Sequence, residues 1–202
     1  MANRDPLPAG KTPAGSVFIV SAPSGAGKHT ILRQAMERDP NLEYSISATT
    51  RRPRPGEKNG KEYYFMDRTE FMRRVEADEF VEWAEVHGNL YGTLRTELMR
   101  RTASGKDVIL ELDVQGMRNF KAVRKDAVTI FIMPPSLAEL ERRLRLRGAN
   151  DEEDLALRLC NARAEIAAKD AFDYVVVNDK IEDAVADFLA IIRARRCRSR
   201  SD

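Results

Sequence analysis

Residues 21–30 constrain the fold most, because they place two glycines and a lysine between an apolar run and a helical one. Their sequence, SAPSGAGKHT, follows the apolar residues 17–21 and precedes a helix predicted over 28–38. Glycines let backbone N–H groups turn around phosphate oxygens, and lysine and the helix N-terminus add positive charge. The pattern predicts a nucleotide phosphate-binding loop, with an ordinary glycine turn as the alternative. The expected loop residues are Ala22, Pro23, Ser24, Gly25, Ala26, Gly27, Lys28, His29 and Thr30.

Two residues depart from the loop pattern G-x-x-x-x-G-K-[ST]. Ala22 replaces the first glycine, and His29 replaces the hydroxyl residue that contacts Mg²⁺. An imidazole cannot reproduce the compact oxygen contact that a hard cation needs, and Thr30 lies about 100° further round the helix. We expect Mg²⁺ to be held by nucleotide phosphates, water and acidic groups elsewhere in the chain. We also expect Mg²⁺ to be needed less strictly than by a loop that carries the hydroxyl.

The rest of the chain alternates strand-like and helical runs, which indicates an α/β fold with a parallel sheet. Strands are predicted over 17–21, 107–113, 127–133 and 173–177, and helices over 28–38, 94–103, 115–123, 136–147, 151–168 and 181–195. The pattern changes after residue 40. Short strands predicted over 44–47, 61–66 and 80–86, with a helix over 69–77, indicate an insert with its own small sheet.

The composition excludes several classes of protein. Of the 202 residues 43% are hydrophobic, yet no apolar run approaches the roughly 18 residues of a membrane span. The first fifteen residues hold no hydrophobic segment of signal-peptide type, so we expect a cytoplasmic protein. The net charge of +2 depends on five arginines and one aspartate in 193–202, which we expect to form a solvated, frayed end. Cys160 and Cys197 lack metal-ligand spacing and are expected to be free thiols.

Residues 50–57, TRRPRPGE, carry three arginines in a stiff segment. A proline favours extended geometry in the residue before it, and a polyproline II helix has three residues per turn. Arg51 and Arg54 are therefore expected on one side, while Arg52 points into solvent. Two adjacent guanidiniums can clamp a dianionic phosphate. A basic surface loop explains this segment equally well.

A second segment, 80–93 with the sequence FVEWAEVHGNLYGT, decides between these alternatives. Together with residues 47–63 it resembles the guanine- and monophosphate-binding segments of guanylate kinases. The phosphate-binding loop, the acidic stretch 109–116, the pair Arg147-Gly148 and residues 177–179 complete a resemblance that covers about residues 17–192.

The resemblance implies an α/β fold with a P-loop three-layer core and parallel sheet, a small mixed α+β monophosphate-binding insert and a helical lid. The implied boundaries are a flexible N-terminal tail over 1–15, the core over 16–43, 94–135 and 169–195, the GMP-binding insert over 44–93, the lid over 136–168 and a basic tail over 196–202.

The resemblance also implies roles for individual residues. The residues implied to bind the GMP phosphate are Arg51, Arg54, Tyr63 and Tyr91, with Glu57 orienting the arginines. The residues implied to bind the guanine base are Ser47, Glu82 and Thr93. Asp113 is implied near the reacting phosphates and the Mg²⁺ shell, Glu111 near the acceptor nucleotide, and Asn178 at the adenine of ATP, with a strand-end cap as the alternative for Asn178. The expected catalytic residues are Lys28, Asp113, Arg147 and Arg158.

The chemistry of guanine agrees independently with this assignment. Guanine presents N1–H and an exocyclic amine as donors, which the Glu82 carboxylate can accept in parallel, and its O6 needs a donor such as the hydroxyl of Ser47 or Thr93. Adenine reverses the pattern and would leave the carboxylate unpaired. Such mismatches can discriminate by about 10⁴-fold or more.

Two lid arginines stand out from their neighbours. Arg143 and Arg145 can pair with a glutamate four residues earlier, but Arg147 has an arginine there and is expected to point inward. Arg158 can pair with Asp154, yet it lies eleven residues after Arg147, as the lid arginines of the family do. Both are expected to stabilise the transition state.

These observations predict transfer of the γ-phosphoryl group of ATP to GMP, and also to dGMP, with Mg²⁺ as the cofactor. No membrane or nucleic-acid partner is expected, and the sequence leaves monomer and homo-oligomer open. The alternative is a weak or inactive module that binds phosphate or phosphopeptide, because of His29. A ribose 1,5-bisphosphate phosphokinase shares the loop and lid but has no need of Glu82 and Thr93.

Overall fold

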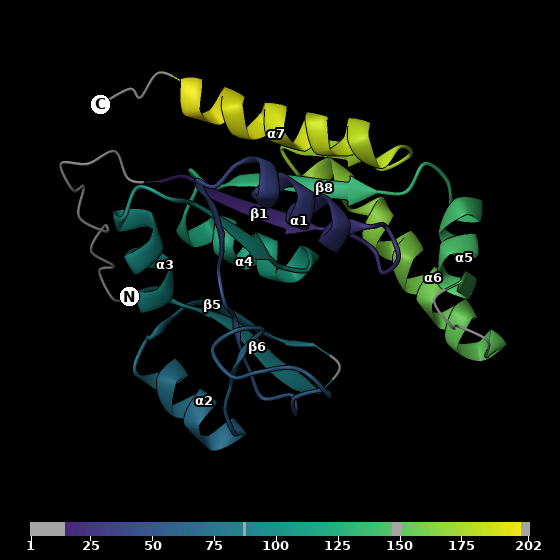
Figure 1. The fold of residues 1–202 in the computed structure, drawn as a ribbon. Helices are drawn as coiled ribbons and strands as arrows, with labels where there is room; N and C mark the ends of the chain where they lie inside the picture. The colour runs from purple at the N-terminus through teal and green to yellow at the C-terminus, as the bar shows by residue number, and fades with distance from the viewer. Residues whose placement is uncertain (1–14, 87, 147–150, 199–202) are drawn as a thin grey trace.

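A parallel five-stranded sheet forms the centre of the structure, a computed structural model that describes residues 15–86, 88–146 and 151–198 (Figure 1). The strand order is β2 (Leu42–Tyr44), β7 (Asp107–Glu111), β1 (Val17–Ser21), β8 (Val128–Met133) and β9 (Tyr174–Val177). Every neighbouring pair is parallel. The carboxyl ends of all five strands therefore meet at one edge, which is where open α/β sheets bind ligands.

Helices cover both faces of this sheet. They are α1 (Lys28–Arg38), α3 (Arg95–Ala103), α4 (Val114–Val123) and α7 (Ile181–Cys197). Successive residues of a strand point to opposite faces, so Phe18 of β1 packs with α1 and α7, whereas Ile19 packs with α3 and α4. Because both faces are buried, β1 is a continuous apolar run and not an alternating one. The predicted three-layer α/β core is confirmed.

A smaller mixed sheet lies below the core in Figure 1. Its strand order is β4 (Tyr64–Phe65), β3 (Ala48–Thr49), β6 (Asn89–Leu94) and β5 (Phe80–Val86), with β3–β4 parallel and the other pairs antiparallel. Helix α2 (Arg68–Glu76) buries Phe71 against Phe80, with ring centroids 4.4 Å apart. This contact gives the small sheet a core of its own.

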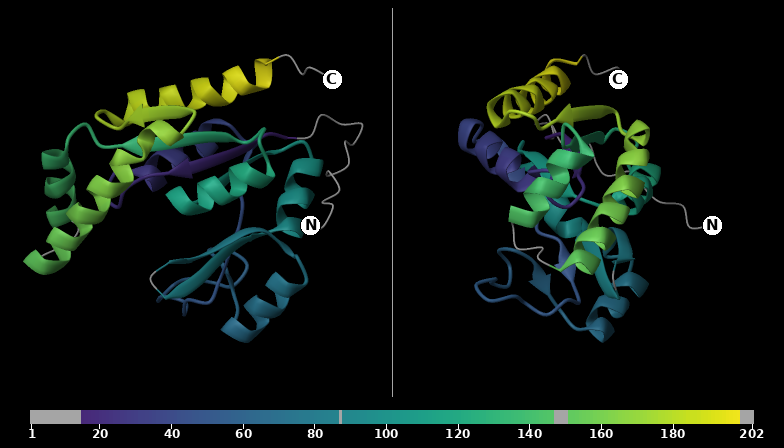
Figure 2. Two further views of the ribbon diagram at one scale, coloured as in Figure 1. Left: turned by 180° about the vertical axis from the view of Figure 1, so that it is seen from behind. Right: turned by 90° about the vertical axis from the view of Figure 1, so that its right-hand side faces the viewer.

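Two further helices, α5 (Leu137–Leu146) and α6 (Glu152–Ala167), project from one end of the five-stranded sheet (Figure 2). They bury Leu140, Leu144 and Leu155 against each other. A short 3₁₀ helix, η1 (Lys169–Ala171), connects α6 to β9. The division of the chain into a core, an insert and a lid with the boundaries given above stays a prediction.

The strand predicted over 44–47 as part of the insert is wrong. Instead β2 ends at Tyr44 and pairs with β7, so it belongs to the five-stranded sheet. Arg101 of α3 bonds Glu43 of this strand at 2.8 Å and Glu97 of its own helix at 2.6 Å, which ties β2 to the core. No separate strand is predicted for β6, because a glycine interrupts the alternation of apolar residues in its sequence, NLYGTL.

The expectation of a solvated, frayed C-terminus is wrong for the residues that the structure describes. Helix α7 runs to Cys197, two residues beyond its predicted end. Arg196 bonds Asp107 at 2.6 Å and Asp39 at 2.7 Å. Asp107 is buried and its other oxygen accepts the N–H of Ser16, so Arg196 near the end of the chain supplies the positive charge that this carboxylate needs inside the fold.

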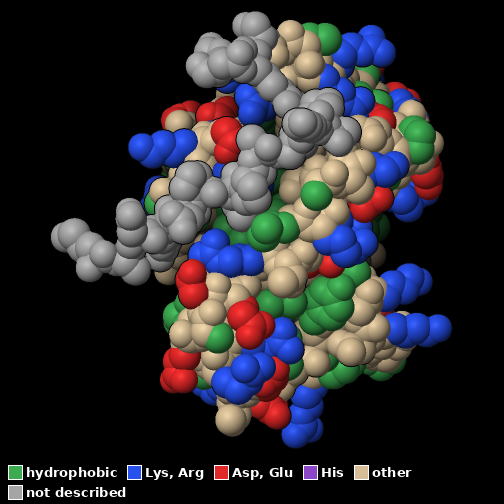
Figure 3. Space-filling view, turned by 90° about the vertical axis from the view of Figure 1, so that its left-hand side faces the viewer, with side chains coloured by type: hydrophobic (Ala, Val, Ile, Leu, Met, Phe, Trp, Pro, Cys, Tyr) green, Lys and Arg blue, Asp and Glu red, His purple; other side chains and the backbone are tan. Residues whose placement is uncertain are grey.

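The outer surface carries both signs of charge. Figure 3 shows acidic and basic side chains interspersed on the face that it presents. Cys160 and Cys197 are exposed free thiols. Within the described parts of the chain, no helix has the length and apolar character needed to cross a membrane.

Candidate active site

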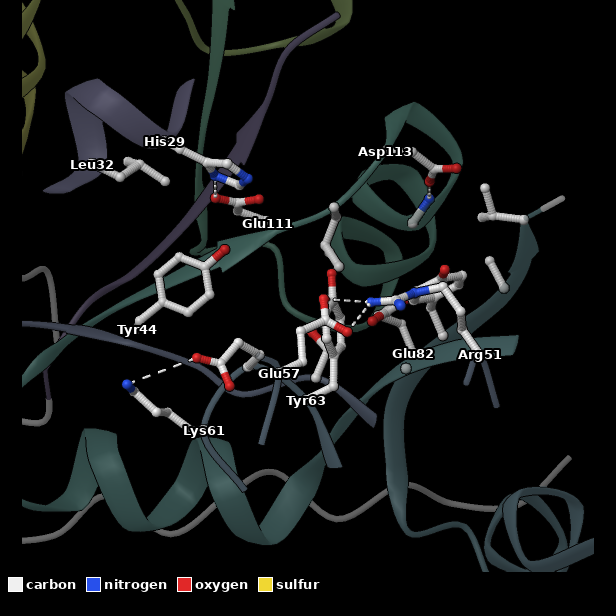
Figure 4. A pocket seen from close by; sticks show the side chains of 18 of the residues that line it. His29, Leu32, Tyr44, Arg51, Glu57, Lys61, Tyr63, Glu82, Glu111 and Asp113 are labelled. Carbon is white, nitrogen blue, oxygen red and sulfur yellow. Dashed lines mark hydrogen bonds and ion pairs between the residues drawn. The ribbon is translucent and has the colours of Figure 1, made fainter. Parts of the chain in front are cut away.

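A cavity of ≈ 600 Å³ lies between the ligand-binding edge of the large sheet and the small sheet (Figure 4). Side chains from distant parts of the sequence line it, among them His29 of α1, Tyr44 of β2, Arg51 and Glu57 from the segment after β3, Glu82 of β5 and Glu111 of β7. The cavity thus lies between the first turn of α1, which follows the phosphate-binding loop, and the arginine-containing segment 50–57.

The loop after β1 has the geometry of an anion-binding turn. Gly25 and Gly27 have φ angles of 90° and 92°, in the left-handed region that favours glycine. No side chain caps α1 at Gly27, so the first N–H groups of the helix remain available to an anion. The side-chain amide of Asn178, at the end of β9, donates to the carbonyl of Ala26 at 2.7 Å and fixes the loop backbone.

The carboxylate of Glu111 is shared by two residues of the loop. Its Oε2 lies 2.9 Å from Nζ of Lys28, and its Oε1 lies 3.0 Å from Nδ1 of His29. Burial raises the pKa of Glu111, but the His29 hydrogen bond, the Lys28 charge and the Tyr44 hydroxyl outweigh it and lower this pKa to about 2. Glu111 is therefore ionised and holds both side chains in place.

Glu57 organises the arginine segment. Its carboxylate accepts two hydrogen bonds from Nη2 of Arg51, at 2.8 and 3.0 Å, and one from the backbone N–H of Arg54 at 2.7 Å. The guanidinium of Arg51 also lies 5.3 Å from the ring centroid of Tyr63. The hydrogen bond to Glu57 is the main cause of a raised pKa at Arg51. The cation is thus held in place before an anion arrives, which lowers the entropy cost of binding.

Glu82 is a buried carboxylate in the wall of the cavity. It is 6% exposed, and its Oε1 accepts a hydrogen bond from the hydroxyl of Thr93 at 2.9 Å. The antiparallel register of β5 and β6 sets this contact, because Glu82 lies opposite Thr93. Burial is the main cause that raises the pKa of Glu82 to about 7; the Thr93 hydrogen bond lowers it and the charge of Asp113 raises it. Such a group has acceptor capacity left for two donors from a ligand.

Comparison with known proteins places these features in a family. The sequence model described as guanylate kinase matches residues 14–195. The chain is 46% identical over 181 residues to the guanylate kinase of Dechloromonas aromatica, covering 90% of each chain. This chain belongs to the guanylate kinase family.

Other members of the guanylate kinase family agree. The chain is 48% identical over 186 residues to the guanylate kinase of Bordetella pertussis, which covers 92% of this chain and 86% of that one. The crystal structure of guanylate kinase from Anaplasma phagocytophilum matches with a TM-score of 0.76 at 37% identity, covering 93% of this chain and 89% of that chain. The fold predicted from the resemblance to guanylate kinases is therefore confirmed.

Most residues that the guanylate kinase resemblance singles out for the acceptor lie at the cavity. They are Ser47, Arg51, Arg54, Glu57, Tyr63, Glu82, Tyr91, Glu111 and Asp113, joined by His29 of the loop. Thr93 lies behind this lining, where it donates to Glu82, and Lys28 lies beside Glu111. Arg52 is exposed, as expected.

The structure also shows the surroundings of three expected residues, Asp113, Asn178 and Arg158. Asp113 is exposed and caps α4, since its Oδ1 accepts the N–H of Gly116 at 2.7 Å. Asn178 is buried and its side-chain amide bonds the loop backbone, and its role at the adenine of ATP stays a prediction. Arg158 pairs with Asp154 at 2.8 Å. Arg147 lies outside the described residues.

Sequence reasoning about this chain missed Tyr44 and Gly92. Tyr44 lines the cavity, and burial, followed by the charge and hydrogen bond of Glu111, raises the pKa of its hydroxyl. Tyr44 falls in a strand predicted for the insert, whereas in the structure it ends β2 of the five-stranded sheet, beside Glu111. Gly92 allows β6 to pass β5 closely, since a Cβ there would lie 2.8 Å from the ring of Phe80 and 3.0 Å from the carbonyl of Glu82. The glycine inside an apolar strand pattern was the signal for this close approach.

The residues around the loop do not fit Mg²⁺ as direct ligands. An imidazole stands at the hydroxyl position, and both oxygens of Glu111 are engaged by Lys28 and His29. In the described part of the chain, no three acidic, histidine or cysteine side chains form a group that could hold a metal ion.

Replacing Glu82 with Gln is expected to stabilise the nucleotide-free protein by about 1–3 kcal/mol at about pH 8. The folded pKa of about 7 exceeds the ordinary 4.5, so the wild type loses stability as the pH rises between these values and its buried carboxylate ionises. Gln keeps an acceptor for Thr93 without the charge. Urea unfolding at about pH 5 and pH 8 measures the difference, which should shrink at the lower pH; an equal difference at both would contradict the raised pKa.

Proposed function

We propose that this chain transfers the γ-phosphoryl group of ATP to GMP, giving ADP and GDP. The observation that carries the proposal is one cavity that is lined by His29 and Glu111 beside the phosphate-binding loop and, on the facing side, by Arg51 of the segment after β3 and Glu82 of β5. Phosphoryl transfer needs two substrates held in line and their charge neutralised, and no covalent intermediate. Membership of the guanylate kinase family supports the same reaction.

The acceptor side would recognise guanine and its phosphate separately. Glu82, when ionised, would accept hydrogen bonds from N1–H and the exocyclic amine. Thr93 already donates to Glu82 and would orient it, which leaves Ser47 in the cavity lining as the donor to O6. The phosphate would bind to Arg51 and Arg54 with the hydroxyls of Tyr63 and Tyr91. The same contacts would admit dGMP, because none of them needs the ribose 2′-hydroxyl.

The donor side would bind ATP at the loop, with Lys28 exchanging Glu111 for the β- and γ-phosphates. Asp113 would lie near the reacting phosphates, and Asn178 would hold the loop backbone. Mg²⁺ would arrive as the ATP complex, coordinated by phosphates and water. The chain would act in the cytoplasm.

Purified protein is expected to release ADP from ATP with GMP and dGMP as acceptors, and about 10⁴-fold less efficiently with AMP. UMP and ribose 1,5-bisphosphate should be similarly poor, because neither presents two donors to Glu82. A coupled ADP assay over this panel measures kcat/KM. The proposal fails if no acceptor supports turnover while GMP or a phosphopeptide binds tightly, the behaviour of a binding module.

The KM for GMP is expected to rise by up to about tenfold per unit as the pH falls below about 7. Protonation of Glu82, whose pKa is about 7, removes the acceptor for N1–H. The phosphate of GMP also titrates in this range, so Glu82→Gln serves as the control that reports the phosphate alone. Identical KM profiles for the wild type and Glu82→Gln would contradict the proposed role of Glu82.

Arg158→Ala is expected to lower kcat by about 10³-fold with little change in KM, because its guanidinium would reach the transferring phosphoryl group only in the closed state. Arg147→Ala should behave in the same way. Arg163→Ala, an exposed arginine on the same helix α6, is the matched control. A loss below about tenfold would remove the tested arginine from the catalytic residues.

A further inference from the structure

The position of His29 raises the question of which cation this chain uses. In phosphate-binding loops a serine or threonine hydroxyl follows the lysine and binds the nucleotide's cation together with an acidic residue from a neighbouring strand. Here His29 stands at the hydroxyl position, and Glu111 ends the strand next to β1, opposite Val20 in the parallel register. These two side chains therefore occupy the two protein positions of the cation site, and they contact each other (Figure 4).

We propose that His29 and Glu111, completed by the phosphates of a bound nucleotide, form a site for a divalent first-row transition metal such as Mn²⁺ in preference to Mg²⁺. Imidazole suits transition metals, and carboxylate suits Mn²⁺ as well as Mg²⁺. Mg²⁺ needs small oxygen ligands in near-ideal octahedral geometry and dehydrates reluctantly. A nitrogen ligand at the loop therefore shifts the preference away from Mg²⁺.

The distance between the two ligand atoms fits a shared metal. Nδ1 of His29 and Oε1 of Glu111 lie 3.0 Å apart. Two ligands at right angles on bonds of about 2.1 Å are separated by about the same distance. A metal could thus take the place of the hydrogen bond once Nδ1 has no proton and the imidazole has turned its lone pair toward the metal. The imidazole is 82% exposed at its side chain, so it is accessible from the cavity.

Lys28 makes this site dependent on nucleotide. Its ammonium lies 2.9 Å from the other carboxylate oxygen of Glu111 and repels a cation there. When a triphosphate binds, its β- and γ-phosphates would take the lysine, so the carboxylate becomes free and the phosphates supply the remaining ligands. The inference rests on one part of the proposed function, namely that the phosphate-binding loop binds a nucleoside triphosphate.

Pulsed EPR of the full chain with Mn²⁺ and the β,γ-methylene analogue of ATP tests the proposal. The wild type is expected to show nitrogen modulation from a coordinated imidazole, altered by ¹⁵N-histidine labelling. His29→Ser should lose it. The chain has two histidines, so His87→Gln is the matched control and should keep the modulation. Without the nucleotide analogue, Mn²⁺ should bind at least about tenfold more weakly to the wild type.

Steady-state assays give the second readout. The ratio of kcat/KM with Mn²⁺ to that with Mg²⁺ is expected to fall at least about tenfold from the wild type to His29→Ser, because serine restores an oxygen ligand. GMP phosphorylation without nitrogen modulation would overturn this inference and leave the proposed function standing. Nitrogen modulation without phosphoryl transfer to any acceptor would support the metal site and overturn the proposed function.

Discussion

The parallel register between β1 and β7 is the constraint on which the site depends. It sets Val20 opposite Glu111, so the acidic end of β7 lies beside the turn that leaves β1. The turn then brings Lys28 and His29 to the two oxygens of that carboxylate. The positions of Lys28, His29 and Glu111 are therefore set by backbone hydrogen bonds within a buried sheet, and not by contacts among these side chains alone.

The pKa of Glu111 is lowered and that of Glu82 is raised, because the two cavity carboxylates differ in the partners that stabilise the ionised form. Glu111 has a lysine, a histidine and a tyrosine as partners, and their combined effect exceeds the cost of burial. Glu82 has a hydroxyl partner and the repulsive charge of Asp113, so burial prevails. A buried charge without a cation is costly in the free protein. That cost is consistent with a group whose partners are supplied by a ligand.

The lid helices are connected to the loop through packing and hydrogen bonds. Gly25 packs closely against α5, since a Cβ there would lie 3.0 Å from methyl groups of Leu140 and Leu144. Arg143 of α5 bonds the carbonyl of Asn178 at 3.0 Å, and the amide of Asn178 bonds Ala26 in the loop. A change in the loop on nucleotide binding therefore has a direct contact path to the helix pair that carries Arg158.

The sequence by itself determined the α/β class, the phosphate-binding loop and nearly all helix boundaries, because these follow from local periodicity and from glycine at left-handed positions. Through the resemblance it also named most of the polar and charged side chains that line the cavity. It could not place β2, since three residues carry too little pattern to show which of two sheets they join. Nor could it pair Arg196 with Asp107, or give Glu111 and Glu82 their opposite pKa shifts. Those outcomes depend on which groups are buried together, some of them as far apart in the chain as Asp107 and Arg196, and only the packed tertiary structure decides that.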